Sequence, residues 1–239
     1  MTMSVAGGGM AGVAVISGAT RGIGLAIARE LASAGFRLSL GVRDPGAVPA
    51  DLRRADVMTH AYDARDRSAA VPWIAATLDR YGGIDALVAN AGIAPFVGLE
   101  DGTDDALDDV FEVNVKAPFR LIQACLPALK ASGRGRVVTV ASLSGKRVMG
   151  LNAGYQMSKH AVVALTHAVR RLGWEHGIRA TALCPGFVDT DLVAGVKDPP
   201  REEMIDSADL ARMVAMIVGL PNTAAVAELL VNCRYEHTL

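Results

Sequence analysis

The sequence predicts an α/β protein, a doubly wound parallel sheet of about seven strands with helices on both faces, folded as a single domain. Three observations predict this fold. Short apolar runs alternate with longer amphipathic stretches along the chain, a glycine-rich turn follows the first apolar run, and polar residues follow later runs. Strands that alternate with helices form parallel sheets, and right-handed crossovers place the helices on both faces.

The first half of the chain is predicted to supply four strands and two helices. The strands are short and largely apolar, and they span 12–17, 37–43, 57–61 and 84–89. Apolar runs of this length are typical of strands that are buried on both faces of a sheet. The helices, at 22–34 and 66–81, repeat apolar residues three and four positions apart, so each has an apolar face.

The second half continues the alternation with three helices and three strands. We expect helices at 105–131, 152–175 and 207–219, and strands at 136–141, 178–183 and 226–231. A soft segment, 193–200, ends in two prolines, but we find no internal repeat and no low-complexity linker. The sequence therefore predicts one domain over 12–239, preceded by a flexible leader at 1–11.

The composition argues against several classes of function. The formal net charge is −1, from 24 Lys and Arg against 25 Asp and Glu, which gives no attraction to nucleic acid or an anionic membrane. No run approaches about 18 apolar residues, so no transmembrane helix is expected. Cys125, Cys184 and Cys233 are too few for a zinc cluster. We expect buried, reduced thiols, a cytoplasmic location and no metal.

A glycine turn follows the first predicted strand. It reads Gly-x-x-x-Gly-x-Gly, with Gly18, Gly22 and Gly24 between that strand and the first helix. Glycines let the backbone approach a pyrophosphate, and a helix N-terminus offers free N–H groups and the positive end of its dipole. A simple tight turn is the alternative, but the position between strand and helix favours dinucleotide binding.

The end of the second strand bears on which dinucleotide is bound. Folds that prefer NAD place an acid there, about 20 residues after the turn, to hold the ribose 2′-hydroxyl. Here Val42 stands at that position, Arg43 follows it, and Arg21 lies in the turn. Two guanidinium groups suit a 2′-phosphate, so we expect NADP(H) rather than NAD(H). In the alternative, Arg43 is a solvated strand end and Asp44 holds the ribose.

Four polar residues form a candidate active site. Tyr155 and Lys159 are four positions apart in one predicted helix and therefore share a face. Ser142 follows a predicted strand at the edge where open α/β sheets bind ligands, and Asn114 interrupts an apolar stretch of a long helix. A Tyr-x-x-x-Lys pair is weak evidence when it stands alone, but here the other motifs accompany it in order.

Together these motifs resemble the short-chain dehydrogenase/reductase family. The matching stretches are Gly18–Gly24, Asp63, Asn90-Ala91-Gly92, Asn114, Ser142, Tyr155-x-x-x-Lys159, and Pro185-Gly186 through Thr190. The resemblance implies a Rossmann-type fold and an oxidoreductase that acts on a carbonyl or alcohol with a nicotinamide cofactor. It also implies a homo-oligomer, a tetramer or dimer, in which the two long helices, 105–131 and 152–175, pack between subunits; alternatively, the small-residue face of helix 152–175 only covers the sheet.

The resemblance implies a role for each candidate catalytic residue. Tyr155 would be the general acid in carbonyl reduction, and Ser142 would hold the substrate oxygen. The ammonium of Lys159, with the charge of the oxidised nicotinamide, would lower the Tyr155 pKa from about 10. Lys159 would also bind the nicotinamide ribose, and Asn114 would bind a water that connects Lys159 to solvent.

The resemblance also implies where the cofactor lies. Asp63 would accept a hydrogen bond from the adenine amino group, unless it is a simple turn residue, and the Val188 backbone would hold the carboxamide. The expected cofactor contacts are Gly18, Thr20, Arg21, Gly22, Ile23, Gly24, Arg43, Asp63, Ala64, Asn90, Ala91, Gly92, Tyr155, Lys159, Pro185, Gly186, Val188 and Thr190.

The expected substrate site is apolar. We expect it to be lined by Phe96, Leu143, Met149, Leu151, Phe187 and Leu192. This lining indicates a hydrophobic ketone or aldehyde. Lys146 and Arg147 lie beside it, and they either bind an anionic substrate or carrier or belong to a solvated loop.

Three other functions are weighed against this reading. Relatives that reduce a 3-oxoacyl group on a carrier commonly close the last strand with Asp-Gly-Gly, which is missing after Val231. An NAD(P)-binding sensor without turnover is disfavoured because all four candidate catalytic residues are present. An epimerase or dehydratase normally needs a larger C-terminal domain than this chain provides.

Overall fold

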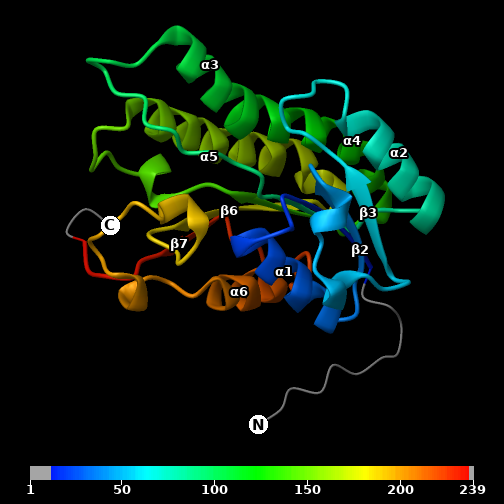
Figure 1. The fold of residues 1–239 in the computed structure, drawn as a ribbon. Coiled ribbons are helices and arrows are strands. Elements are labelled where there is room, and N and C mark those ends of the chain that lie inside the picture. The colour runs from blue at the N-terminus through cyan, green and yellow to red at the C-terminus, as the bar shows by residue number, and fades with distance from the viewer. Residues whose placement is uncertain (1–11, 237–239) are drawn as a thin grey trace.

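Residues 12–236 are described by the computed structural model, and within them seven strands form one parallel sheet (Figure 1). The strands are β1 (Val13–Ser17), β2 (Arg37–Val42), β3 (Val57–Ala61), β4 (Ala86–Ala89), β5 (Arg136–Val140), β6 (Arg179–Pro185) and β7 (Glu228–Val231). Every neighbouring pair is parallel. The predicted fold class is confirmed, and the predicted leader at 1–11 lies outside the described residues.

The strand order puts a reversal at the centre of the sheet. Along the sheet the strands run β3-β2-β1-β4-β5-β6-β7, so the chain moves outward from β1 in one direction and, from β4 onward, in the other. Open α/β sheets bind ligands beyond the carboxyl ends of the strands at such a reversal. The fold therefore points to the ends of β1 and β4, where the glycine turn and Asn90 follow.

Helices cover both faces of the sheet. The α-helices are α1 (Gly22–Ser33), α2 (Ala70–Tyr81), α3 (Asp104–Phe111), α4 (Ala117–Ser132), α5 (Ala153–Gly173) and α6 (Ser207–Gly219). Figure 1 shows α2, α4 and α5 above the sheet and α1 and α6 below it. The short 3₁₀ helices are η1 (Pro45–Ala47), η2 (Ala50–Leu52), η4 (Leu143–Gly145), η5 (Trp174–His176), η6 (Asp191–Val193) and η7 (Arg201–Glu203).

Two predicted helices were wrong in extent. The helix expected from 66 begins only at Ala70, because the Asp63 and Asp66 carboxylates accept hydrogen bonds from backbone N–H groups two residues on and hold turns there. The helix expected over 105–131 is divided by a π-helical turn, η3 (Glu112–Lys116), in which the Ala117 N–H reaches the Glu112 carbonyl. Such turns inside helices often occur at functional sites.

The core is a layer on each side of the sheet. One layer joins α1 and α6 to the sheet through residues such as Ile27 and Val214, and the other contains Trp73 and Leu121. Trp73 is fully buried, and its indole N–H donates to the Ser39 hydroxyl at 2.9 Å. A Cβ on Gly41 would lie 2.4 Å from the Trp73 ring, so glycine in β2 makes room for the indole.

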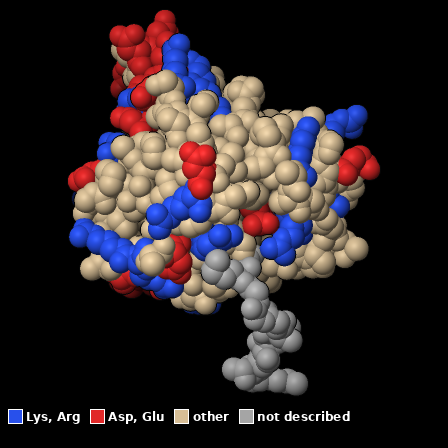
Figure 2. All heavy atoms as spheres, turned by 90° about the vertical axis from the view of Figure 1, so that its right-hand side faces the viewer, with Lys and Arg blue, Asp and Glu red and all other residues tan. Residues whose placement is uncertain are grey.

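Charge distribution and helix hydropathy bear on the expectations from composition. On the face shown in Figure 2, basic and acidic side chains are interspersed among a majority of other residues. Within 12–236, no helix is both long and apolar enough to cross a membrane.

Candidate active site

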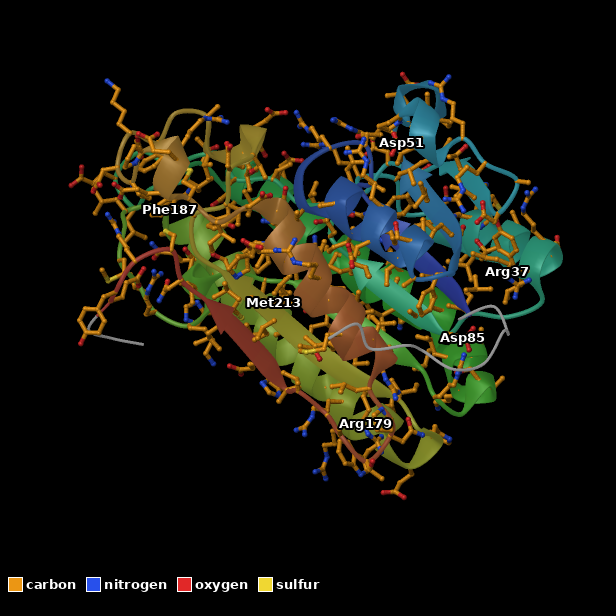
Figure 3. All side chains as sticks on the ribbon, turned by 90° about the horizontal axis from the view of Figure 1, so that it is seen from below. Arg37, Asp51, Asp85, Arg179, Phe187 and Met213 are labelled. Atoms are coloured by element: carbon orange, nitrogen blue, oxygen red, sulfur yellow. The ribbon has the colours of Figure 1, made fainter. Side chains whose placement is uncertain are left out.

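The candidate site residues gather at one end of the sheet. Ser142 lies just beyond the end of β5, Asn90 just beyond β4, and Pro185 ends β6. Because these strands are parallel, their carboxyl ends share an edge. Figure 3 shows Phe187, which follows β6, at the opposite end of the sheet from Asp85 and Arg179, which mark the starts of β4 and β6.

The glycine turn after β1 requires its glycines. Gly18 and Gly22 have φ angles of +72° and +54°, in the left-handed region that side chains disfavour. A Cβ on Gly24 would lie 2.3 Å from the Gly18 carbonyl oxygen. The turn is therefore a bare backbone surface that leads directly into α1.

Asn90 holds this turn against the sheet. Its side-chain amide donates to the carbonyls of Ser17 and Gly18, both at 3.0 Å, and its backbone N–H donates to the Ser17 hydroxyl. The Asn90 side chain is thereby committed to the turn. The cofactor contact that the resemblance implies for Asn90 would therefore come from its backbone. Ser17 was not predicted as a site residue, although it is the last residue of β1 and directly precedes the glycine turn, a position that could have identified it.

The N-terminus of α1 is left uncapped. Arg21 is the N-cap residue, its side chain makes no capping hydrogen bond, and the first turn has no acidic residue. The first N–H groups of a helix have no partner within the helix. This exposed end and the glycine surface beside it fit a pyrophosphate, which is the chemistry that a dinucleotide would present. Thr190 closes over the turn, with Cγ2 3.1 Å from where a Cβ on Gly22 would lie.

Arg43 follows the end of β2, whereas Arg21 lies in the turn after β1. Val42 is buried, whereas Arg43 is exposed and has no ion pair among the described residues. The Asp44 carboxylate accepts a hydrogen bond from the Gly46 N–H and so caps η1. Arg21 forms an exposed ion pair with Asp191 at 2.9 Å, a partner that the sequence did not reveal.

Ser142 and Tyr155 are brought into contact. The Ser142 side chain lies beside Tyr155, and its hydroxyl accepts from the Ser144 N–H at 3.0 Å and reaches the Pro185 carbonyl at 3.4 Å. Burial raises the pKa of the Tyr155 phenol, and the Ser142 hydrogen bond acts in the opposite direction. The predicted lowering of this pKa is thus not a property of the protein alone. It would need the charge of the oxidised nicotinamide.

Lys159 is a buried amine beside the tyrosine. Its side chain is 6% exposed, and its Nζ donates to the Val140 carbonyl at 2.8 Å and lies 5.6 Å from the centre of the Tyr155 ring. Burial lowers the pKa of Lys159 to about 8. A Cβ on Gly92 would lie 3.7 Å from this Nζ, so the end of β4 approaches the same group.

Asn114 lies in the π-helical turn and connects it by hydrogen bonds to Ile93 and Ser158. Its amide donates to the Ile93 carbonyl at 2.9 Å and to the Ser158 hydroxyl at 3.0 Å, and its oxygen accepts from the Ile93 N–H. Ser158 in turn donates to the Tyr155 carbonyl. Both amide protons of Asn114 are in use, so the predicted water contact stays a prediction. Neither Ile93 nor Ser158 was predicted, because nothing local distinguishes them.

The remaining cofactor residues occupy ordinary backbone positions. Asp63 holds a turn by accepting the Arg65 N–H at 2.9 Å, as the alternative reading proposed, and Ala64 is buried. Val188 is buried and forms an isolated bridge with Ile205. The Thr190 hydroxyl donates to the Val188 carbonyl at 3.3 Å.

Most of the expected substrate-lining residues are accessible. Phe96, Met149, Leu151 and Leu192 are exposed, and Phe187 is half-buried. Leu143 differs, because it is 1% exposed and packs in a small core cluster with Val162 and Cys184. From that place it supports the loop after Ser142 and offers no surface to a substrate.

Lys146 and Arg147 are neither free nor simply solvated. Lys146 pairs with Glu228 at 2.7 Å, and Arg147 pairs with Glu236. Both acids come from β7 and the segment after it. Their charges neutralise Lys146 and Arg147. This pairing corrects both predictions for these residues, a site for an anionic substrate or carrier and a solvated loop.

Known proteins resemble this chain in sequence. The family model described as short chain dehydrogenase matches residues 12–201. An agropine synthesis reductase of Rhizobium rhizogenes is 37% identical over 94% of this chain, although the chain spans only 53% of that protein. The D-beta-hydroxybutyrate dehydrogenase of Rhizobium meliloti is 35% identical over 89% of this chain and 85% of its own length.

A solved structure extends the likeness to three dimensions. The alcohol dehydrogenase of the archaeon Thermococcus sibiricus, complexed with 5-hydroxy-NADP, superposes with a TM-score of 0.85 at 31% identity, covering 95% of this chain and 98% of that one. Fold and sequence therefore agree. The chain belongs to the short-chain dehydrogenase family.

Proposed function

We propose that the protein is an NADP(H)-dependent oxidoreductase that interconverts a carbonyl compound and an alcohol. One observation carries this proposal: Tyr155 lies beside both Ser142 and the Lys159 amine, at the sheet edge that also holds the glycine turn. This arrangement supplies a proton donor, an oxyanion partner and a cation beside a surface suited to a dinucleotide.

Each of the three side chains has a role in carbonyl reduction. A bound nicotinamide cofactor supplies the hydride. Tyr155 gives its phenolic proton to the carbonyl oxygen as negative charge develops there, and Ser142 donates a hydrogen bond to the same oxygen. The Lys159 ammonium stabilises the resulting phenolate by its charge. For alcohol oxidation, the same groups act in reverse.

Arg21 and Arg43 support a preference for NADP(H). Arg43 is exposed without an ion pair among the described residues, and the exposed partner of Arg21 exchanges easily with a phosphate. The competing ribose acid, Asp44, already caps η1. Apolar residue Val42 occupies the position where NAD-binding folds place an acid.

The site favours an apolar ketone or aldehyde over an acyl carrier. Exposed Phe96, Met149, Leu151 and Leu192 offer apolar surface on the segments that follow β4, β5 and β6. The two basic residues that would attract an acidic carrier, Lys146 and Arg147, are paired with acids. A sensor without turnover would have no need of the Ser142–Tyr155 contact.

We also propose a homo-oligomer, a dimer or tetramer, and a reducing, cytoplasmic setting. The small residues of α5 at 161, 164 and 168 would allow close packing of this helix against a second copy. Burial raises the pKa of the Cys184 thiol to about 11 and keeps that thiol protonated. Sedimentation of the purified protein measures the oligomeric state.

A cofactor-and-carbonyl panel tests the proposal. Purified protein is mixed with NADPH or NADH and a series of ketones and aldehydes, and loss of reduced cofactor is followed at 340 nm. We expect turnover with apolar carbonyls and a higher kcat/KM with NADPH than with NADH. Equal or better efficiency with NADH would contradict the cofactor preference, and no turnover with any carbonyl would contradict the enzymatic role.

A further inference from the structure

Two loops border the candidate active site. The first, 143–152, connects Ser142 to the start of α5 and hence to Tyr155. The second, 186–206, leaves β6 directly after Pro185, whose carbonyl the Ser142 hydroxyl contacts. Any shift of one loop relative to the other therefore changes the space in front of the catalytic groups.

Both loops are tied to β7 at their bases. Lys146 of the first loop pairs with Glu228 of β7 at 2.7 Å. The Gly186 N–H of the second loop donates to the Val231 carbonyl at 2.8 Å. The segment 232–236, which we call the tail segment, continues from this strand and reaches both loops further out.

The tail segment holds the first loop through Glu236. The Arg147 Nε donates to the Glu236 carboxylate at 2.6 Å, and these side chains are only 14% and 10% exposed. Charges removed from water are stable only when they are paired, so this ion pair is a strong tie. After Arg147, the loop exposes Val148, Met149 and Leu151.

The tail segment holds the second loop through Arg234. Its guanidinium pairs with Asp198 at 3.0 Å and lies 5.8 Å from the centre of the Phe187 ring. Phe187 lies at the catalytic end of the sheet in Figure 3. A single segment of five residues thus joins the apolar parts of both loops.

We propose that Arg147 and Glu236 are positioning residues that fix the gap between the two loops and so limit the length of apolar substrate that fits. This inference rests on the proposed function, because it concerns the substrate of the same site. Neither residue touches the reacting atoms. Their effect passes through the position of the 143–152 loop.

The test uses variants of the full chain. Glu236→Gln and Arg147→Gln each break the pair, and the double variant Arg147→Glu with Glu236→Arg rebuilds it in reverse. Asp51→Asn is the matched control, because it breaks the Arg29–Asp51 ion pair between α1 and η2. The readouts are kcat and KM for 2-pentanone and 2-decanone, and hydrogen exchange of the amides in 143–152.

In the single variants we expect the ratio of kcat/KM for 2-decanone to kcat/KM for 2-pentanone to rise about tenfold, mainly through KM. This size corresponds to the loss of one charge-assisted hydrogen bond. Amides of the first loop should exchange faster. The double variant should restore most of both effects, and the control should show neither.

Unchanged selectivity and unchanged exchange in both single variants would overturn the inference. Hydrogen exchange also separates it from the proposed function, because it needs no turnover. If the wild-type protein reduces no carbonyl while the loop still exchanges faster in the variants, the proposed function fails and the positioning role of the pair stands.

Discussion

Burial moves the pKa values of Tyr155 and Lys159 in opposite directions, because it favours the neutral form of each group. It raises the pKa of the Tyr155 phenol and lowers the pKa of the Lys159 amine to about 8. The phenol therefore stays protonated through the neutral range, which suits a proton donor. Lys159 changes charge closer to physiological pH than an ordinary lysine does, so we expect it to set the alkaline limit of reduction.

The pH dependence of reduction tests this assignment. Lys159 is charged below its pKa of about 8 and neutral above it, so kcat/KM for carbonyl reduction should fall as the pH rises through about 8. The kcat/KM profile reports groups of the free enzyme, which is the state described here. A rate that stays constant to pH 10 would show that the charge of Lys159 is not needed.

Arg43 carries the second prediction at this scale. Arg43→Ala removes a guanidinium proposed to bind the 2′-phosphate, so the Kd for NADPH should rise about tenfold while the Kd for NADH stays unchanged. Fluorescence titration measures both constants. Arg80→Ala is the control, because Arg80 lies in the last turn of α2, at the other end of the sheet. Equal weakening of both cofactors by Arg43→Ala would contradict the phosphate contact.

Single elements show where sequence patterns suffice and where they fail. The strands were predicted within about two residues, since apolar runs follow directly from burial on both faces. The π-helical turn at Glu112–Lys116 was missed, because a shift in hydrogen bonding leaves the apolar period of the long helix nearly intact. Leu143 was assigned to the substrate site because its burial depends on packing that no local pattern encodes.

The packing of α2 on the sheet requires a glycine at position 41. Gly41→Ala would place a Cβ 2.4 Å from the buried Trp73 ring, so it should destabilise the protein by about 1–3 kcal/mol. Urea denaturation measures this change. Gly83→Ala is the matched control, since a Cβ there meets nothing within 4 Å. Equal stability of the two variants would contradict the account of this contact.

At the scale of the whole molecule, the two ends of the sheet differ: one holds the candidate active site, and the other holds contacts that stabilise the fold. The candidate catalytic groups and the glycine turn lie at the carboxyl ends of the strands, around the reversal between β1 and β4. At the opposite end, the buried Arg136 guanidinium donates to the carbonyls of Gly177 and Leu220, which follow α5 and α6. Cations are favourable at helix C-termini, so this arginine stabilises the fold.

The motifs of the candidate active site were predictable because they are local. The contacts that hold these motifs in place were not, because they join residues distant in the sequence. The glycine turn, Ser142 and the Tyr155–Lys159 pair each stand next to a recognisable strand or on one helix face. The ion pairs of Lys146 and Arg147 join residues more than 80 positions apart, and Asp191 pairs with Arg21 across 170 positions. Local periodicity holds no information on such contacts.

The most direct test of the central claim is the substitution Tyr155→Phe. It removes only the phenolic oxygen, so the fold should persist and NADPH should bind with the wild-type Kd in a fluorescence titration. NADPH-dependent reduction of the best carbonyl substrate should fall about a thousandfold or more, because the proton donor is gone. A variant that keeps wild-type turnover would contradict the assignment of Tyr155 as the general acid, and with it the account of this site.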